Sequence, residues 1–213
     1  MSADVEDILG RLNQLKINFD ALLRYWAIYQ AATNSTAVNQ LLTSNDPGAN
    51  GVIVIRTGMA RLVVLNLRRA LEPVGGDRWS MLAILDLLAP SSAVATLSDP
   101  MVASKSGFGS LERRVTALEE CRHRIIANSE SDDAAWIRRL RHEDIAHSRT
   151  QSSLWDQRSA GDLNTFVLSV ADDAFRLCDT IIGAPQATDT YAMAYREAEA
   201  FWALVGGRND INS

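Results

Sequence analysis

One short segment of this 213-residue chain holds residues whose types and spacing suit chemistry on an anion. Arg141, Asp144 and His147 follow one another at three-residue intervals inside a stretch of helical pattern. At about 100° per residue, this spacing places the three side chains within a sector of roughly 120° on one helix face. The sequence therefore predicts an arginine, a carboxylate and a histidine along one edge of a helix, facing a groove or a partner.

These residue types suit the cleavage of RNA without a metal ion. The guanidinium of Arg141 is a permanent cation whose planar donors match phosphate oxygens. The imidazole of His147 titrates near neutral pH, so it would take the proton of a ribose 2′-OH or protonate the leaving oxygen. Arg141 would stabilise charge that develops on the phosphorus centre. Asp144 would orient His147 or simply hold Arg141.

A plain structural interpretation of the same residues stays open. A histidine at a helix C-terminus commonly stabilises the helix dipole, and an arginine three residues before an aspartate is ordinary on a helix surface. By spacing alone, this structural interpretation of Arg141 and His147 is favoured over catalysis.

The distribution of charge favours an anion-facing site in this part of the chain. The net charge of −5 argues against broad, sequence-independent binding to a duplex, which depends on many phosphate contacts. Arg138 and Arg149 flank the segment and are predicted to contact RNA. The segment and its flanks hold two of the three histidines and a group of arginines, namely Arg138, Arg139, Arg141 and Arg149.

A helix over about 132–147 is predicted to carry these side chains. Ser131 or Asp132 suits its N-cap position, because a short oxygen-bearing side chain accepts from the free N–H groups of the first turn. Apolar residues mark the face that would turn inward, namely Ile137, Leu140 and Ile145.

Apolar residues recur at steps of three and four along most of the chain, which predicts helices almost everywhere. The longest is expected over about 4–32. The β-branched run 52–55 would suit the start of a strand, but apolar residues continue to Leu71 without a turn signal, which favours a long, heavily buried helix. Further helices are predicted over 79–88, 91–97, 111–126, 163–182 and 188–205, with a loop around a short helical turn over 34–51.

No repeat, low-complexity tract or interdomain linker divides the sequence. We therefore predict one all-α domain over 1–213, an antiparallel helical bundle in which short loops join neighbouring helices. A long N-terminal helix and a C-terminal helical extension at about 186–205 complete it.

Composition predicts a soluble globular protein, because 47% of the residues are hydrophobic and 22% are charged. Strictly apolar runs are short, and the acidic N-terminus lacks the pattern of a signal peptide. Cys121 and Cys178 form neither a disulfide framework nor a metal-binding pattern and are expected to be small buried side chains. His123 is expected to have a solvated or packing role. A cytoplasmic protein without metal or cofactor is predicted.

The segment from Arg141 to His147 (Arg-His-Glu-Asp-Ile-Ala-His) resembles the Arg-polar-x4-His signature of the HEPN superfamily, the higher eukaryotes and prokaryotes nucleotide-binding proteins. Extended to Leu140 and Ser148, it is especially similar to the Leu-Arg-x-x-x-(Ile/Leu)-Ala-His form of the AbiU2-like branch. The helices predicted over 61–71 and 79–88 also resemble a helix pair of that branch. The specific part of the resemblance covers nine residues.

This resemblance implies a helical bundle that forms a homodimer, with the arginines and histidines of both subunits gathered in an interface cleft. Many members are metal-independent endoribonucleases of toxin–antitoxin and abortive-infection systems. Carried over, Arg141 and His147 would be the catalytic pair and His142 the polar neighbour. Some members have a Tyr two residues after the His as a target for adenylylation. Here Arg149 stands at that position, which speaks against such control.

Three hypotheses follow. The chain is a HEPN-type ribonuclease that acts as a toxin or phage-defence effector, with an antitoxin or defence-system protein as partner. Alternatively, it is a non-catalytic HEPN protein that binds RNA or a nucleotide. In the third, it is a helical dimerisation or scaffold domain in which the motif is ordinary surface.

Overall fold

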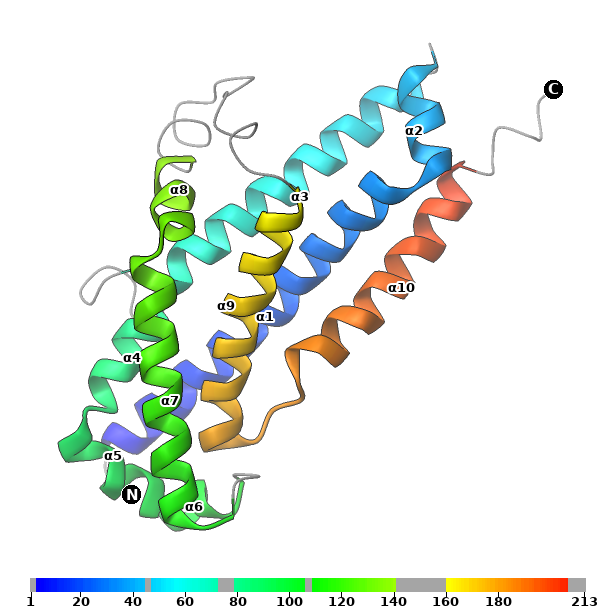
Figure 1. The fold of residues 1–213 in the computed structure, drawn as a ribbon. Helices are drawn as coiled ribbons and strands as arrows, with labels where there is room; N and C mark the ends of the chain where they lie inside the picture. Colours follow the sequence, from blue (N-terminus) through cyan, green and yellow to red (C-terminus); the bar gives the residue numbers. More distant parts are fainter. Residues whose placement is uncertain (1–2, 45–46, 73–78, 106–108, 141–159, 207–213) are drawn as a thin grey trace. The chain divides into compact units, whose positions relative to one another are not determined.

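The computed structural model describes residues 3–44, 47–72, 79–105, 109–140 and 160–206. Within these ranges all regular structure is helical and no strand is present (Figure 1), which confirms the predicted all-α class. The helices are α1 (Ala3–Asn34), α2 (Thr36–Thr43), α3 (Gly48–Ala70), α4 (Met81–Leu87), α5 (Pro90–Ser98), α6 (Pro100–Ala103), α7 (Leu111–Glu130), α8 (Asp132–Leu140), α9 (Ala160–Ile182) and α10 (Ala187–Gly206).

The chain is organised as two compact units. Unit 1 comprises Met1–Phe19 and Val64–Ala187, and unit 2 comprises Asp20–Val63 and Thr188–Ser213. Two of the boundaries fall inside the long helices α1 and α3, so each of these helices contributes residues to both units. The sequence has no linker at these points because the chain continues as helix through them.

In unit 1, α7 and α9 lie side by side and run in opposite directions (Figure 1). Their facing sides are apolar at helical spacing, so packing removes these side chains from water. The buried residues of the two helices include Leu118, Ile125, Val167, Val170 and Leu177. The short helices α4 and α5 pack against α7, and α6 packs against α9.

Two arginines of α7 bind carbonyl groups at the ends of α4 and α5. Arg122 donates to the carbonyl oxygens of Leu88 at 2.5 Å and Leu85 at 3.3 Å. The buried Arg114 donates to the carbonyl oxygen of Leu97 at 2.6 Å. The last carbonyls of a helix have no intrahelical partner and carry partial negative charge, so a cation stabilises them. These arginines hold the short helices against α7.

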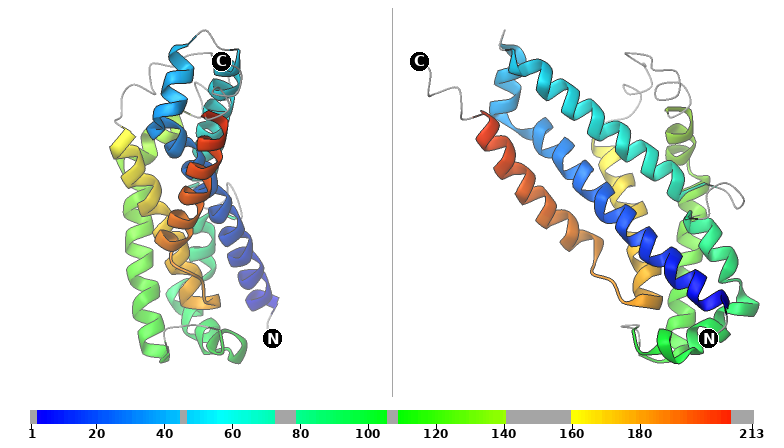
Figure 2. Two further views of the ribbon diagram at one scale, coloured as in Figure 1. Left: turned by 90° about the vertical axis from the view of Figure 1, so that its right-hand side faces the viewer. Right: turned by 180° about the vertical axis from the view of Figure 1, so that it is seen from behind.

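In unit 2, the second half of α1 contacts both α3 and α10, and it lies between them in Figure 2. The indole Nε1 of Trp202 donates to the carbonyl oxygen of Ile28 at 3.0 Å, and Arg24 pairs with Glu197 at 3.0 Å. The apolar core around Trp202 draws on all four helices of this unit and contains Ala31, Ala32, Val38, Leu41, Val52 and Ala198.

The segment predicted as a loop around a short turn contains more helix than expected. The side chain of Ser35 accepts a hydrogen bond from the N–H of Val38 at 3.3 Å and so caps the eight-residue helix α2. Val38 and Leu41 are then buried in the core of unit 2. This tertiary packing stabilises a helix that would be marginal by itself.

The prediction of a helix over 52–71 is confirmed, but the prediction that it is heavily buried is wrong. Val52, Ala60 and Val63 are buried, whereas Ile53 and Val54 are exposed on the other side of α3. Apolar residues surround this part of the helix, and the described structure covers one side of it.

Among the described residues, α3 is long and apolar enough to cross a lipid bilayer by length and composition alone. Helices α4 and α5 meet the same criterion of length and composition if they are counted as one bent span. Core helices of soluble proteins meet the same criterion, so length and composition alone do not identify a membrane span.

Candidate functional site

Helix α8 leads directly into the segment that carries the Arg-polar-x4-His pattern. Its N-terminus lies where the sequence predicts it, because the hydroxyl of Ser131 accepts a hydrogen bond from the N–H of Ala134 at 3.1 Å. Asp132 and Asp133 occupy the first turn, where negative charge is favoured by the helix dipole.

The inward face of α8 is also as predicted. Ile137 and Leu140 are buried, together with Trp136, which the apolar pattern does not single out. Arg139 lies on the exposed side. The helix is therefore held by three large apolar side chains up to the residue before Arg141.

Arg138 has a structural contact in addition to its predicted role in RNA binding. Its side chain is half-buried, and one Nη donates to the carbonyl oxygen of Ser129 at 3.1 Å. Ser129 lies in the last turn of α7, so the guanidinium satisfies a carbonyl that lacks an intrahelical partner. Contact between Arg138 and RNA stays a prediction.

The remaining predicted site residues lie outside the described residues. These are the catalytic pair Arg141 and His147, the supporting His142 and Asp144, and Arg149. Their spacing, and the predicted inward position of Ile145, stay predictions from the sequence.

A polar cluster between α7 and α9, built around one fully buried carboxylate, is the main chemical feature that sequence reasoning missed. We call it the α7–α9 cluster. It consists of Arg124, Asn128, Ser169, Asp172, Asp173 and Arg176. A signal was present in the sequence, because Asp173 occupies a position of α9 that is otherwise part of the apolar stripe.

Asp173 is the centre of this cluster and is fully buried. Its Oδ2 accepts a hydrogen bond of 2.6 Å from Nδ2 of Asn128. Its Oδ1 lies 2.8 Å from Nε of Arg124, without the alignment of a hydrogen bond, so this contact is ionic in character. Burial raises the pKa of Asp173, and the bond from Asn128 and the charge of Arg124 lower it by less.

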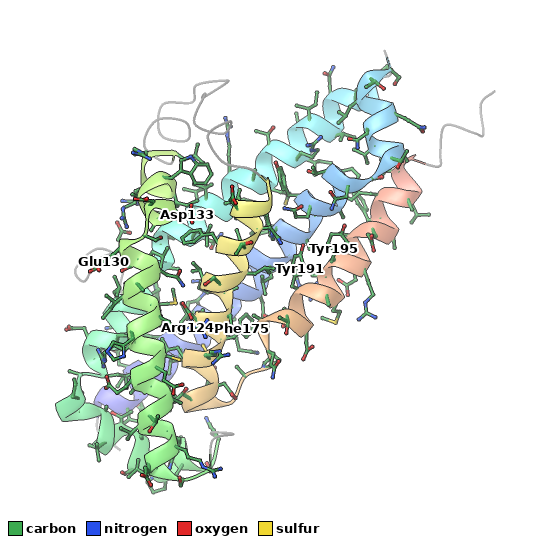
Figure 3. The ribbon with its side chains drawn as sticks, in the orientation of Figure 1. Arg124, Glu130, Asp133, Phe175, Tyr191 and Tyr195 are labelled. Atoms are coloured by element: carbon green, nitrogen blue, oxygen red, sulfur yellow. The ribbon has the colours of Figure 1, made fainter. Side chains whose placement is uncertain are left out.

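Arg124 extends from α7 toward α9 (Figure 3) and links both acids of the cluster. It reaches Oδ2 of Asp172 at 2.8 Å, and Arg176 reaches the same oxygen at 2.9 Å. Burial lowers the pKa of Arg124, but the hydrogen bond to Asp172 and the two carboxylate charges together outweigh it and raise the pKa. Two arginines and two aspartates leave the cluster formally neutral.

The cluster is suited to holding α7 and α9 in register, and it is poorly suited to catalysis. A fully buried carboxylate such as Asp173 does not reach a substrate. The neighbouring thiol of Cys121 is also buried, and burial, followed by the charge of Asp173, raises its pKa to about 11, which disfavours the nucleophilic thiolate. The prediction that both cysteines are small buried side chains is confirmed for Cys121 and Cys178.

Two further observations concern His123 and the capacity to bind a metal ion. His123 is exposed on α7, which agrees with the predicted solvated role. Within the part of the chain that the structure describes, no group of three His, Cys, Asp or Glu side chains gathers closely enough to hold a metal ion.

Comparisons with family models, with curated proteins and with solved structures find no match for this chain. Beyond the fold class, the assignment of a function therefore depends on the residues themselves.

Proposed function

We propose that this protein is a HEPN-type, metal-independent endoribonuclease that acts as a toxin or phage-defence effector. The observation that carries the proposal is the pattern from Arg141 to His147, which follows helix α8 in an all-helical chain. Support comes from the anchoring of α8, whose buried Trp136, Ile137 and Leu140 would give the start of the motif a rigid base.

In this mechanism the chain cleaves RNA by attack of a ribose 2′-OH on the adjacent phosphorus. His147 takes the proton of the 2′-OH or protonates the leaving oxygen. Arg141 binds the phosphate and stabilises its developing charge. Asp144 orients His147, His142 is the polar neighbour, and Arg138 and Arg149 hold the RNA backbone. The site is shared by two subunits of a cytoplasmic homodimer, and an antitoxin or other defence-system protein controls it.

Cleavage of RNA in the presence of a chelator tests the proposal. The full chain is incubated with single-stranded RNA in EDTA, beside the variants Arg141→Ala and His147→Ala. A positioned acid or base, and a group that stabilises the developing charge, each contribute about a hundredfold or more, so each variant should lose at least that much activity. RNA carrying 2′-O-methyl groups should resist cleavage, since the attacking hydroxyl is blocked.

Arg139→Ala provides the matched control. Arg139 is an exposed arginine two residues before the motif, so its removal takes away the same charge and leaves the proposed chemistry intact. Its activity should stay within about threefold of the wild type, because one exposed phosphate contact contributes little. Cleavage that survives both Arg141→Ala and His147→Ala would contradict the proposal.

The same variants separate the two alternatives. Saturable RNA binding that is lost in Arg141→Ala, without strand cleavage in the wild type, would identify a non-catalytic binding protein. Unchanged RNA binding in the double variant of Arg141 and His147 would favour a helical dimerisation or scaffold domain.

A further inference from the structure

A single residue, Ser131, joins α7 to α8. Helix α7 ends at Glu130 and α8 begins at Asp132, so Ser131 lies between two helices without a loop on either side. Its backbone is extended, with φ −66° and ψ 159°, so the helical path is interrupted at this one residue. Figure 1 shows α8 leaving the C-terminal end of α7. The conformation at Ser131 therefore sets the direction of α8.

The hydroxyl of Ser131 binds both helices at once. Its Oγ accepts a hydrogen bond from the N–H of Ala134 at 3.1 Å, which caps the first turn of α8. The same Oγ donates to the carbonyl oxygen of Asn128 at 2.7 Å, in the last turn of α7. For the other serines that cap described helices, the structure shows the capping bond without a bond to a preceding helix, namely for Ser35, Ser80 and Ser110.

Two further bonds hold this joint in unit 1. Arg138, in the second half of α8, donates to the carbonyl oxygen of Ser129 at 3.1 Å and so binds α8 to α7 a second time. The side chain of Asn128 donates to Asp173 of α9, which fixes the residue whose carbonyl Ser131 binds. Hydrogen bonds are directional, whereas apolar burial is not. The polar contacts therefore define the angle between α7 and α8 more sharply than the apolar face of α8 does.

This angle determines where α8 delivers the proposed motif, because Arg141 follows directly after Leu140, the last residue of α8. At about 1.5 Å per residue, α8 is about 13 Å long, so a tilt of about 10° at Ser131 moves its far end by about 2 Å. Misplacement of reacting groups by about 1 Å costs about a hundredfold in rate. A small change at the joint is thus large enough to affect chemistry at the motif.

We propose that Ser131 is a positioning residue of the ribonuclease site, an inference that rests on the proposed function. Its hydroxyl sets the direction of α8 and so places Arg141 at the phosphate, without touching RNA itself. Loss of the bond to Asn128 therefore slows the chemical step and leaves RNA binding nearly unchanged.

Three substitutions of Ser131 separate this role from helix capping. Ser131→Thr keeps a hydroxyl that both accepts and donates. Ser131→Asp keeps an acceptor that caps α8 as well as serine does, but an ionised carboxylate has no proton for the carbonyl of Asn128. Ser131→Ala loses both bonds. Ser110→Ala is the matched control, because Ser110 caps the opposite end of α7 through the N–H of Arg113 at 3.4 Å.

Steady-state cleavage of single-stranded RNA by the full chain in EDTA gives kcat and KM for each variant. In Ser131→Ala and Ser131→Asp, kcat should fall at least about tenfold while KM stays within about threefold. Ser131→Thr and Ser110→Ala should stay within about threefold of the wild type in both constants. Thermal unfolding followed by circular dichroism should give a lower midpoint for the two alanine variants and a midpoint close to that of the wild type for Ser131→Asp.

The outcomes separate this role from the proposed function. If the wild type cleaves RNA, His147→Ala does not, and Ser131→Asp keeps the wild-type kcat, the positioning role alone is wrong. It is also wrong if Ser131→Thr or Ser110→Ala loses as much kcat as Ser131→Asp, because the bond to Asn128 is then not the cause. A wild type that leaves RNA intact overturns the proposed function and this role with it. If Ser131→Ala does not fold, Ser131→Asp decides the test, since its cap is kept.

Discussion

Asn128 donates a 2.6 Å hydrogen bond from Nδ2 to Oδ2 of Asp173, and this bond joins the middle of α9 to the C-terminal half of α7. The same Nδ2 lies 3.1 Å from the hydroxyl oxygen of Ser169. A buried carboxylate is costly unless its oxygens are satisfied. Asn128, together with Arg124 at Oδ1, therefore offsets the cost of burying Asp173 in unit 1.

Replacement of Asn128 by alanine should destabilise the protein by about 1–3 kcal/mol, because it leaves Oδ2 of Asp173 buried without its donor. Urea unfolding followed by circular dichroism measures the change. Glu130→Ala is the control, because Glu130 is an exposed residue at the end of the same helix, and its effect should stay within about 0.5 kcal/mol. Equal effects of the two substitutions would show that the hydrogen bond contributes nothing.

Asp173 should make stability depend on pH in the opposite direction to an ordinary paired carboxylate. Its folded-state pKa is raised above the ordinary 3.8 by burial. The folded state therefore binds the proton more tightly than the unfolded state, and the stability from Asp173 is fully present below pH 3.8 and lost as the pH rises through the raised value.

Comparison with Asp173→Asn isolates this effect, because the other titrating groups are shared. The unfolding free energy of the wild type minus that of the variant should fall as the pH rises from about 4 to 7. A constant difference, or one that grows with pH, would contradict the raised pKa.

Gly183 should tolerate substitution less well than Gly109, although both have positive φ, 66° and 70°. A Cβ at Gly183 would lie 2.6 Å from the backbone oxygen of Lys105, whereas a Cβ at Gly109 has open space. Gly109→Ala should cost about 1–2 kcal/mol from the backbone alone. Gly183→Ala should cost more, because a backbone oxygen moves less easily than a side chain. Thermal unfolding of both variants checks the order, and equal losses would contradict the steric argument.

Cys121 should react slowly with thiol reagents in the folded protein. Its pKa is raised from 9.0 to about 11 by burial and by the charge of Asp173, which lowers the thiolate fraction at pH 8 by about a hundredfold. Cys178 is also buried, so a colorimetric thiol assay should detect almost no fast-reacting thiol in the native state and both thiols in denaturant. A fast-reacting thiol in the native state would contradict this prediction.

The sequence alone determined the class of the fold and the position of most helices. Periodicity of apolar residues located α1, α4, α5, α7, α9 and α10, and the N-cap Ser131 located the start of α8. These features are local, because a helix requires apolar residues at its own spacing and a capping side chain within three residues. The inward side of α8 was predictable for the same reason.

The proposed site from Arg141 to His147 also comes from the sequence alone, because a motif is defined by residue types and their spacing. What the sequence left open were the neighbours of each side chain. Arg114 and Arg122 belong to an ordinary charged helix pattern, and the tertiary structure places them on carbonyls of other helices.

Burial was decided by the tertiary structure. The run 52–55 has the composition of a core helix, yet Val54 is exposed because no described element covers that side of α3. Asp173 has the charge of a surface residue, yet it is buried because Asn128 and Arg124 from α7 meet it there. Periodicity identifies which side of a helix is apolar, but which sides are covered depends on elements far away in the chain.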